Sequence, residues 1–218
     1  AGFHSSVTLG GFNLDPLLKN VHVGWSPTTG WLGLGITRKG LGTLEDFVYS
    51  RYQMYRKVYG HKTSIGFDWL LRCALDEVLG DVESYAYIDT CLSSMEAFQT
   101  LTDNFFWEAF RRLAGKRKDS ASHDLVYRRR LRPLASAENL SMEQASSVTQ
   151  TLAEEHGLPT TAIICCPLKA RFSRIQPGFN EIQVLDGNRY RTITECSEFF
   201  QKFSDQTLFH FYLGRPSP

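Results

Sequence analysis

The stretch "KRKDSASHD", residues 116–124, separates two parts of the sequence that differ in hydrophobic period. In the part before it, apolar residues recur at helical spacing; they include Leu44, Phe47, Met54, Val58 and Ile65. A second amphipathic region, residues 94–115, ends at Gly115, and glycine is typical of helix C-termini. The stretch 116–124 is itself polar, which is typical of a linker. The sequence therefore predicts a mainly helical part followed by a linker.

The part after residue 124 mixes strand-like and helical segments. Three segments have the apolar or alternating pattern of strands: residues 125–134, 160–168 and 207–213. Residues 141–157 predict a capped helix that ends at a glycine, and residues 181–194 predict a hairpin that turns at Asp186-Gly187. The predicted fold class is therefore mainly α followed by a smaller α+β lobe, with domains at 1–118 and 124–218.

The composition excludes several classes of protein. The 218 residues carry 24 Lys and Arg against 23 Asp and Glu, and a net charge of +1 gives no global argument for nucleic acid or membrane. No apolar run approaches the roughly 18 residues of a membrane span. The five cysteines are odd in number and form no CxxC pair, so a disulfide framework is not expected. We expect an intracellular protein, cytoplasmic or nuclear, with Cys165 and Cys166 as buried thiols.

The segment "SRYQMYRKVYGHKTS", residues 50–64, carries five potential cations and three tyrosines. At about 100° per residue, Arg51, Tyr55, Tyr59 and Lys62 fall within roughly 80° of one another, so they share one broad helix face. Guanidinium groups bind phosphate oxygens, and tyrosine rings pack on sugars or bases. This combination suits a nucleotide. The alternative is a solvated basic face whose tyrosines are half-buried at its edge.

The same segment resembles the pattern R-x-x-x-h-R-x-x-Y-x-H-K of HD-superfamily deoxynucleoside triphosphate triphosphohydrolases. Further stretches are similar in the same order: "GGFNLDPLL" (10–18), "ITRKGLGTLEDF" (36–47) and "LTDNFFWEAF" (101–110). The resemblance extends to the vertebrate restriction factor of the family and to its bacterial members. It implies that residues 1–118 are the C-terminal part of an HD-domain helical fold.

The resemblance also implies substrate-binding residues. Arg51 matches the family's arginine that reaches the triphosphate, and Tyr59 matches the tyrosine that packs on the deoxyribose. Tyr55 stands where the restriction factor carries a histidine near the scissile phosphate. Gly60 replaces a larger polar residue that touches the base there.

Four positions match cations that contact an effector nucleotide between subunits in the regulated relatives: Lys39, His61, Lys62 and Arg128. Thr37, Thr43 and Asp124 stand where those relatives carry arginine, asparagine and arginine. An aspartate at such a position would repel phosphate.

Hydrolysis in this family needs a divalent metal held by an H…HD…D ligand set that precedes the segment 10–18. We therefore expect metal ligands outside this chain, and we assign no catalytic residue and no metal ligand within it. The His123-Asp124 dipeptide lies in the predicted linker and is interpreted as a chance pair.

Two functions stay open. The chain is part of an enzyme that cleaves deoxynucleoside triphosphates to a deoxynucleoside and inorganic triphosphate, or it is a non-catalytic nucleotide-binding or scaffolding module. Phe105, Phe106, Trp107 and Phe110 offer more apolar surface than one helix face can hide. We expect homo-oligomer contacts or the missing segment that carries the metal ligands to cover it. We expect no membrane partner, and the sequence leaves a nucleic-acid partner open.

Overall fold

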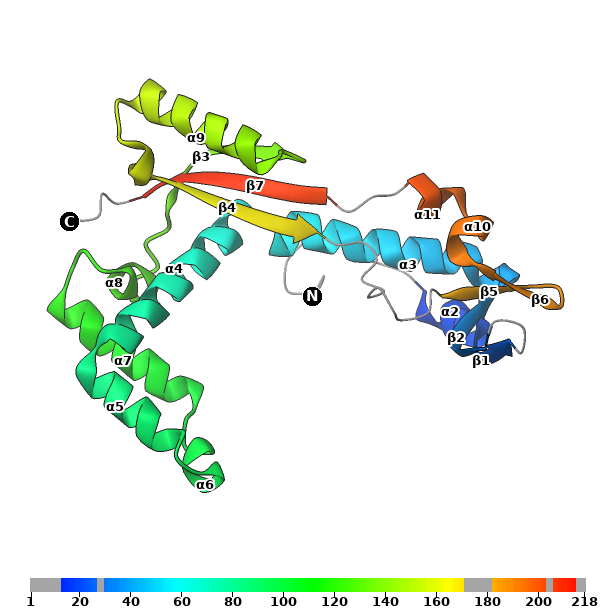
Figure 1. Cartoon of the computed structure of the whole chain (residues 1–218), viewed down its shortest axis with the longest axis horizontal. Coiled ribbons are helices and arrows are strands. Elements are labelled where there is room, and N and C mark those ends of the chain that lie inside the picture. The colour runs from blue at the N-terminus through cyan, green and yellow to red at the C-terminus, as the bar shows by residue number, and fades with distance from the viewer. Residues whose placement is uncertain (1–12, 27–29, 171–181, 203–205, 215–218) are drawn as a thin grey trace. The chain divides into compact units, whose positions relative to one another are not determined.

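The computed structural model describes residues 13–26, 30–170, 182–202 and 206–214, which belong to two compact units (Figure 1). The first unit combines Ala1–His61 with Leu168–Leu208, and the second combines Lys62–Pro167 with Phe209–Pro218. Each unit is therefore assembled from two separate segments of the chain. The predicted domain limits, 1–118 and 124–218, differ from the limits of these units.

The first unit holds a four-stranded sheet, one long helix and several short helices. Its elements are α2 (Leu14–Asn20), β1 (Val21–Ser26), β2 (Trp31–Thr37), the 3-10 helix η1 (Arg38–Gly40), α3 (Leu41–Met54), the π-helix η2 (Tyr55–Tyr59), β5 (Gln183–Asp186), β6 (Arg189–Thr192), α10 (Ile193–Cys196) and α11 (Glu198–Lys202).

The four-stranded sheet has the order β1-β2-β5-β6. β1 and β2 form an antiparallel hairpin, β5 and β6 form another, and β2 pairs with β5 in parallel, with Ile36 opposite Val184. The predicted hairpin turn at Asp186-Gly187 is confirmed, because Gly187 has a φ of 63°, a left-handed conformation that favours glycine. The core of this unit joins residues from both chain segments: Leu17, Ile36, Leu41, Leu44, Val184 and Ile193.

The predicted fold class, the mainly α C-terminal part of an HD-domain helical fold followed by an α+β lobe, is wrong. Each unit has an α+β arrangement with strands of its own. The hairpin of β5 and β6, which we expected in the C-terminal lobe, hydrogen-bonds to β2 and completes the sheet of the first unit. Local hydrophobic periods indicate which segments are strands but not which distant strands pair. The predicted fold class was wrong because the pairing of β5 with β2 has no local signal.

The second unit holds a group of helices and a three-stranded sheet covered by a further helix (Figure 1). Its elements are α4 (Lys62–Gly80), α5 (Val82–Cys91), α6 (Met95–Phe98), α7 (Asp103–Lys116), α8 (Ala121–Val126), β3 (Arg132–Glu138), α9 (Met142–His156), the 3-10 helix η3 (Thr160–Ala162), β4 (Ile163–Ala170) and β7 (Gln206–Leu213). The sheet has the order β3-β7-β4, and both β4 and β7 cross a limit between the units.

The predicted capped helix of residues 141–157 is confirmed at both ends by α9. Ser141 and Gln144 form a reciprocal capping box, and Gly157 ends the helix with a φ of 63°. Its inner face contributes Ala145 and Ala153 to a core that also contains residues of β4 and β7. The local signals of residues 141–157 were therefore sufficient for this element.

The predicted linker at 116–124 is wrong, because most of its second half is buried. Helix α8 begins within it, and the exposed fractions of Ser122, His123 and Asp124 are 0%, 6% and 5%. The carboxylate of Glu77 on α4 accepts hydrogen bonds from the Ala121 and Ser122 backbone N–H groups at 2.7 and 3.0 Å. A polar stretch is thus buried because a distant side chain satisfies it.

The aromatic residues of α7 mostly pack within the second unit. Phe110 is 2% exposed, and Phe105 and Phe106 lie against the core around it. Trp107 is 41% exposed and makes an edge contact with Phe110 at 5.6 Å between ring centroids. Because most of this aromatic surface is buried within the unit, it no longer supports the predicted homo-oligomer. The oligomer stays a prediction. Within the described ranges, no helix combines the length and apolar character needed to cross a membrane.

Candidate functional site

The candidate site lies on the long helix of the first unit, where α3 continues into the π-helix η2. Helix α3 starts at Leu41 with Gly40 as its N-cap. Buried Leu41, Leu44 and Tyr52 anchor the helix to its unit. The anchored helix positions the side chains of residues 51–59 at its C-terminal end.

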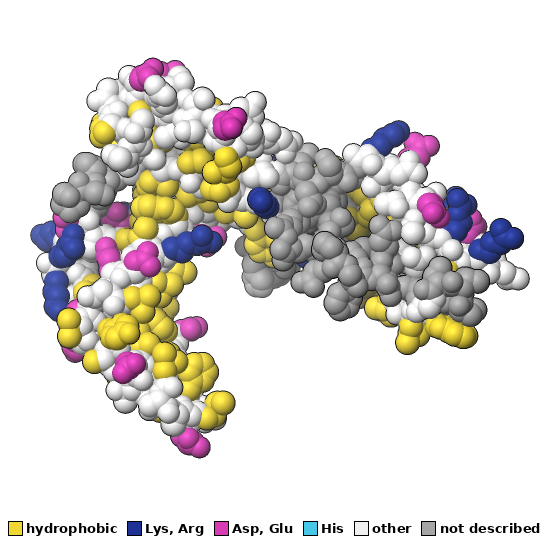
Figure 2. Space-filling model, in the orientation of Figure 1, with side chains coloured by type: hydrophobic (Ala, Val, Ile, Leu, Met, Phe, Trp, Pro, Cys, Tyr) yellow, Lys and Arg dark blue, Asp and Glu magenta, His cyan; other side chains and the backbone are white. Residues whose placement is uncertain are grey.

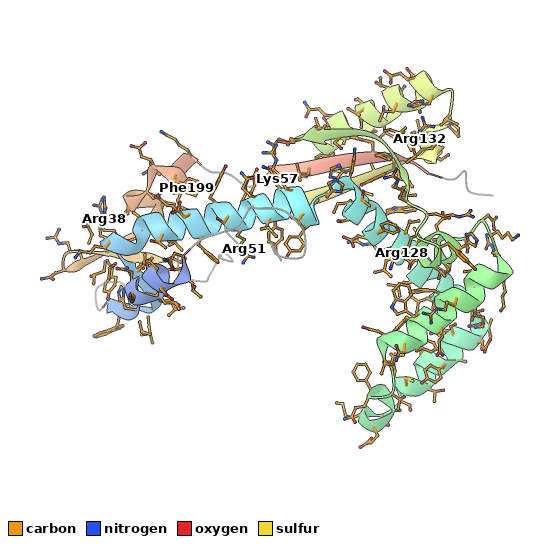
Figure 3. All side chains as sticks on the ribbon, turned by 180° about the vertical axis from the view of Figure 1, so that it is seen from behind. Arg38, Arg51, Lys57, Arg128, Arg132 and Phe199 are labelled. Atoms are coloured by element: carbon orange, nitrogen blue, oxygen red, sulfur yellow. The ribbon has the colours of Figure 1, made fainter. Side chains whose placement is uncertain are left out.

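The three predicted substrate-binding residues are brought together. The guanidinium carbon of Arg51 lies 5.3 Å from the centroid of the Tyr55 ring, and the Tyr55 and Tyr59 ring centroids are 5.3 Å apart. Tyr55 and Tyr59 are 37% and 50% exposed, so part of each ring faces solvent. Figure 3 shows Arg51 and Lys57 on different sides of this helix. The result is an exposed stack of one cation and two phenol rings, in which the ring planes are tilted by 53° to each other and are not parallel.

The π-helical turn determines where Tyr59 lies. The Gly60 backbone N–H donates to the Tyr55 carbonyl at 2.6 Å, a bond that spans five residues instead of four. A Cβ atom on Gly60 would lie 2.8 Å from that carbonyl oxygen and 3.0 Å from Leu168 Cδ2, so the turn has room only for glycine. The π-helix ends at Gly60, its C-cap, and the π-turn itself was not predicted. Its only sequence signal is a glycine five residues after Tyr55.

The four predicted effector-binding residues are divided between the units. Lys39 in η1 and His61 after the π-turn belong to the first unit, and both are exposed. Lys62 begins α4, where its carbonyl accepts a hydrogen bond from the Tyr212 hydroxyl, and Arg128 follows α8 with a φ of 52°. Their assignment to one effector nucleotide stays a prediction.

The described residues contain no group of three or more His, Cys, Asp or Glu side chains that could hold a metal. His123 and Asp124 lie next to each other in α8, with 3.9 Å between Nδ1 and Oδ1, and the His123 ring packs against Tyr127. This pair belongs to no larger group of metal-ligating side chains among the described residues, so we assign it no metal.

The two adjacent cysteines of β4 do not supply a nucleophile. Burial raises the pKa of Cys166 to about 11, and the neighbouring Cys165 adds to the effect. Burial also raises the pKa of Cys165. A thiol must lose its proton to attack a phosphate or a carbonyl, and at neutral pH Cys166 keeps it. The interpretation as a buried structural thiol is confirmed for Cys166, whereas Cys165 is only half-buried.

Comparison with known proteins gives a likeness of fold. The sequence matches no protein-family model and has no significant match among curated proteins. A solved structure of a hypothetical protein from Aquifex aeolicus is similar with a TM-score of 0.72 at 19% identity, over 98% of this chain and 51% of that one. A phosphohydrolase from Bacteroides thetaiotaomicron VPI-5482 is similar with a TM-score of 0.63 at 16% identity, over 98% of this chain and 59% of that one. The chain thus has the fold of a little over half of each of these proteins.

Proposed function

We propose that this chain is part of a phosphohydrolase that cleaves deoxynucleoside triphosphates to a deoxynucleoside and inorganic triphosphate. The observation that carries the proposal is the exposed stack of Arg51, Tyr55 and Tyr59. A guanidinium group forms charge-assisted hydrogen bonds with phosphate oxygens, and a phenol ring offers a flat surface to a sugar or base. The likeness of fold to a protein described as a phosphohydrolase supports the same class of reaction.

The stacked residues have separate roles in this proposal. Arg51 binds the triphosphate, and the Tyr55 ring beneath its guanidinium group restricts the orientation of that group. Tyr59, which the π-turn holds beside Tyr55, packs on the deoxyribose. In the complete enzyme, a divalent metal with ligands outside this chain would polarise the phosphate. This chain contributes binding and orientation, and its catalytic group lies elsewhere.

The remaining predicted residues have a regulatory role in this proposal. Lys39, His61, Lys62 and Arg128 contact an effector nucleotide, and the active protein is a homo-oligomer of an intracellular compartment. We base this part on the family resemblance of these positions.

The experiment is a hydrolysis assay on the full-length protein. With Mn²⁺ or Mg²⁺ present, we expect release of inorganic triphosphate from deoxynucleoside triphosphates. Arg51→Ala should lower kcat/KM about tenfold to hundredfold, which corresponds to a charge-assisted contact of about 1.5–3 kcal/mol. Lys57→Ala is the matched control, because it removes an exposed cation from the π-helix on another side, and it should leave turnover near the wild-type value.

Two results would redirect the proposal. Wild-type turnover in Arg51→Ala would show that the stack is a solvated basic face. Binding of deoxynucleoside triphosphates by the wild-type protein without release of triphosphate would favour the non-catalytic nucleotide-binding or scaffolding module.

A further inference from the structure

The outer face of helix α5 carries larger apolar side chains than a surface helix usually exposes. Its inward face is formed by Ser84, Ile88 and Cys91, which are buried. On the outward side, Val82 and Tyr85 are 86% and 57% exposed, and at about 100° per residue they lie roughly 60° apart around the helix. A surface helix normally turns its apolar face inward. The outer face of α5 is therefore an apolar surface without a partner among the described residues.

The apolar surface continues past the end of α5. Leu92 follows Tyr85 by seven residues, so it lies on the same side of the helix, and it is 62% exposed. Helix α6, which contacts α5, adds Met95 and Phe98, with exposed fractions of 71% and 50%. Figure 2 shows hydrophobic and acidic side chains over this part of the second unit.

The same region concentrates negative charge. Residues 73–110 contain eight Asp and Glu and no Lys, Arg or His. All 24 Lys and Arg of the chain, and the remaining 15 of its 23 Asp and Glu, lie outside this region. The net charge of +1 thus conceals an acidic segment that includes the whole of α5 and α6.

Some of these carboxylates have no cation within the chain. Asp81 pairs with Arg112. Asp89 and Glu96 are exposed and form no ion pair with any residue that the structure describes. Asp89 follows Val82 by seven residues, so an unpaired carboxylate lies on the apolar face itself.

The charge restricts what can cover this surface. Carboxylates repel nucleic acid and membranes of anionic lipid, because both carry negative charge at their surfaces. They also repel the same region of a second copy of this chain. A cationic amphipathic helix matches both properties of the surface, since it combines an apolar stripe with flanking lysines or arginines.

We propose that the outer face of α5, together with α6, docks a cationic amphipathic helix of a partner protein. Apolar side chains of that helix pack on Val82, Tyr85 and Leu92. Its lysines or arginines pair with Asp89 and Glu96, which increases the association rate and fixes the orientation of the helix. This interaction goes beyond the proposed hydrolysis and does not depend on it.

The test measures fluorescence anisotropy of a labelled peptide with the full-length protein. The probe is a peptide of about 18 leucines and lysines in which leucine recurs at helical spacing. The control peptide has the same composition with leucine and lysine alternating, so it has the same charge but no apolar helix face. We expect the helical peptide to bind at least about tenfold more tightly than the alternating one, with an affinity that falls as salt rises.

The first pair of variants tests the apolar contact. Val82→Gln combined with Leu92→Gln should weaken binding of the helical peptide about tenfold or more, because both changes remove exposed apolar surface. The matched control is Val23→Gln combined with Leu34→Gln, which changes exposed apolar side chains on β1 and β2 of the first unit. The control should bind like the wild type. Circular dichroism establishes that each variant is folded.

The second pair of variants tests the charge. Asp89→Asn combined with Glu96→Gln should weaken binding about fivefold and make the affinity less dependent on salt. Glu143→Gln combined with Glu155→Gln removes the same charge from exposed positions of α9 and should have no such effect.

Four outcomes would overturn the proposal. They are equal binding of the two peptides by the wild type, wild-type affinity in the variant of Val82 and Leu92, equal weakening in either control variant, and self-association of the wild type that the variant of Val82 and Leu92 abolishes. The last outcome, measured by sedimentation, would assign the face to a second copy of the chain.

Discussion

Asp81 and Arg112 are joined side chain to side chain, with Arg112 Nη2 donating to Asp81 Oδ2 at 2.7 Å and Nη1 to Oδ1 at 3.4 Å. Asp81 is also the N-cap of α5, where it accepts hydrogen bonds from the Ser84 backbone N–H and hydroxyl. The bonds from Arg112 and Ser84 hold the pKa of Asp81 well below its ordinary value. One carboxylate therefore connects α5 to α7.

The first prediction concerns how the free energy of unfolding depends on pH. A depressed pKa means that the unfolded chain binds a proton more readily than the folded chain, so the contribution of Asp81 is present above about pH 4 and is lost as pH falls below it. Asp81→Ala should lower the free energy of unfolding at pH 7 by about 2–3 kcal/mol, and by clearly less near pH 3. Urea unfolding of the full-length protein at both pH values measures this.

Glu83→Gln is the control for that experiment. Glu83 Oε2 lies 2.8 Å from Arg112 Nη1, but the Glu83 side chain is 76% exposed, so its removal should cost less than about 1 kcal/mol. An equal loss in Asp81→Ala at the two pH values would contradict the assignment.

The second prediction concerns Glu77, which caps α8 from a distant helix. Glu77→Gln leaves one amide oxygen to accept from the Ala121 and Ser122 N–H groups and the Ser122 hydroxyl, and should destabilise the protein by about 1–3 kcal/mol. Hydrogen exchange should rise first at residues 121–124. Asp76→Asn changes the neighbouring exposed carboxylate, and a loss of similar size there would show that charge alone is responsible.

The third prediction concerns the π-turn. Gly60→Ala should destabilise the protein by about 1–3 kcal/mol, because the new methyl group meets the Tyr55 carbonyl and Leu168. The same change at Gly42, a helical position of α3 with nothing within 4 Å of an added Cβ, should stabilise it by about 0.5–1 kcal/mol. Thermal unfolding compares the two variants, and similar effects from both would argue against a tight turn at Gly60.

The fourth prediction concerns the thiol of Cys166. With a pKa near 11, about one molecule in a thousand carries the thiolate at pH 8, so labelling by a disulfide reagent should be slow. In denaturant the rate should rise by two orders of magnitude or so, as for an ordinary thiol. Mass spectrometry of labelled peptides identifies the residue, and fast labelling of native Cys166 would exclude the buried position.

The features that the sequence predicted correctly have their causes within a few residues. The ends of α9 follow from Ser141, Gln144 and Gly157, and the β5–β6 hairpin follows from Asp186-Gly187. Helical spacing also placed Arg51 and Tyr55 on one face. In each case the atoms that decide the structure belong to neighbours in the chain.

The features that the sequence did not predict depend on distant residues. The polar stretch before Asp124 is buried because Glu77 reaches it from α4, and β5 joins β2 through a pairing that no local pattern reveals.

The discontinuous units have a consequence for biosynthesis. In the first unit the Ser197 hydroxyl donates to Glu45, 152 positions away, and in the second the Tyr212 hydroxyl donates to the Lys62 carbonyl, 150 positions away. Neither unit can therefore complete its fold during synthesis before its second chain segment has left the ribosome. Contacts of such long range slow folding and leave partly formed sheets exposed in the meantime. A nascent chain of this topology is therefore prone to aggregation until β7 has been made.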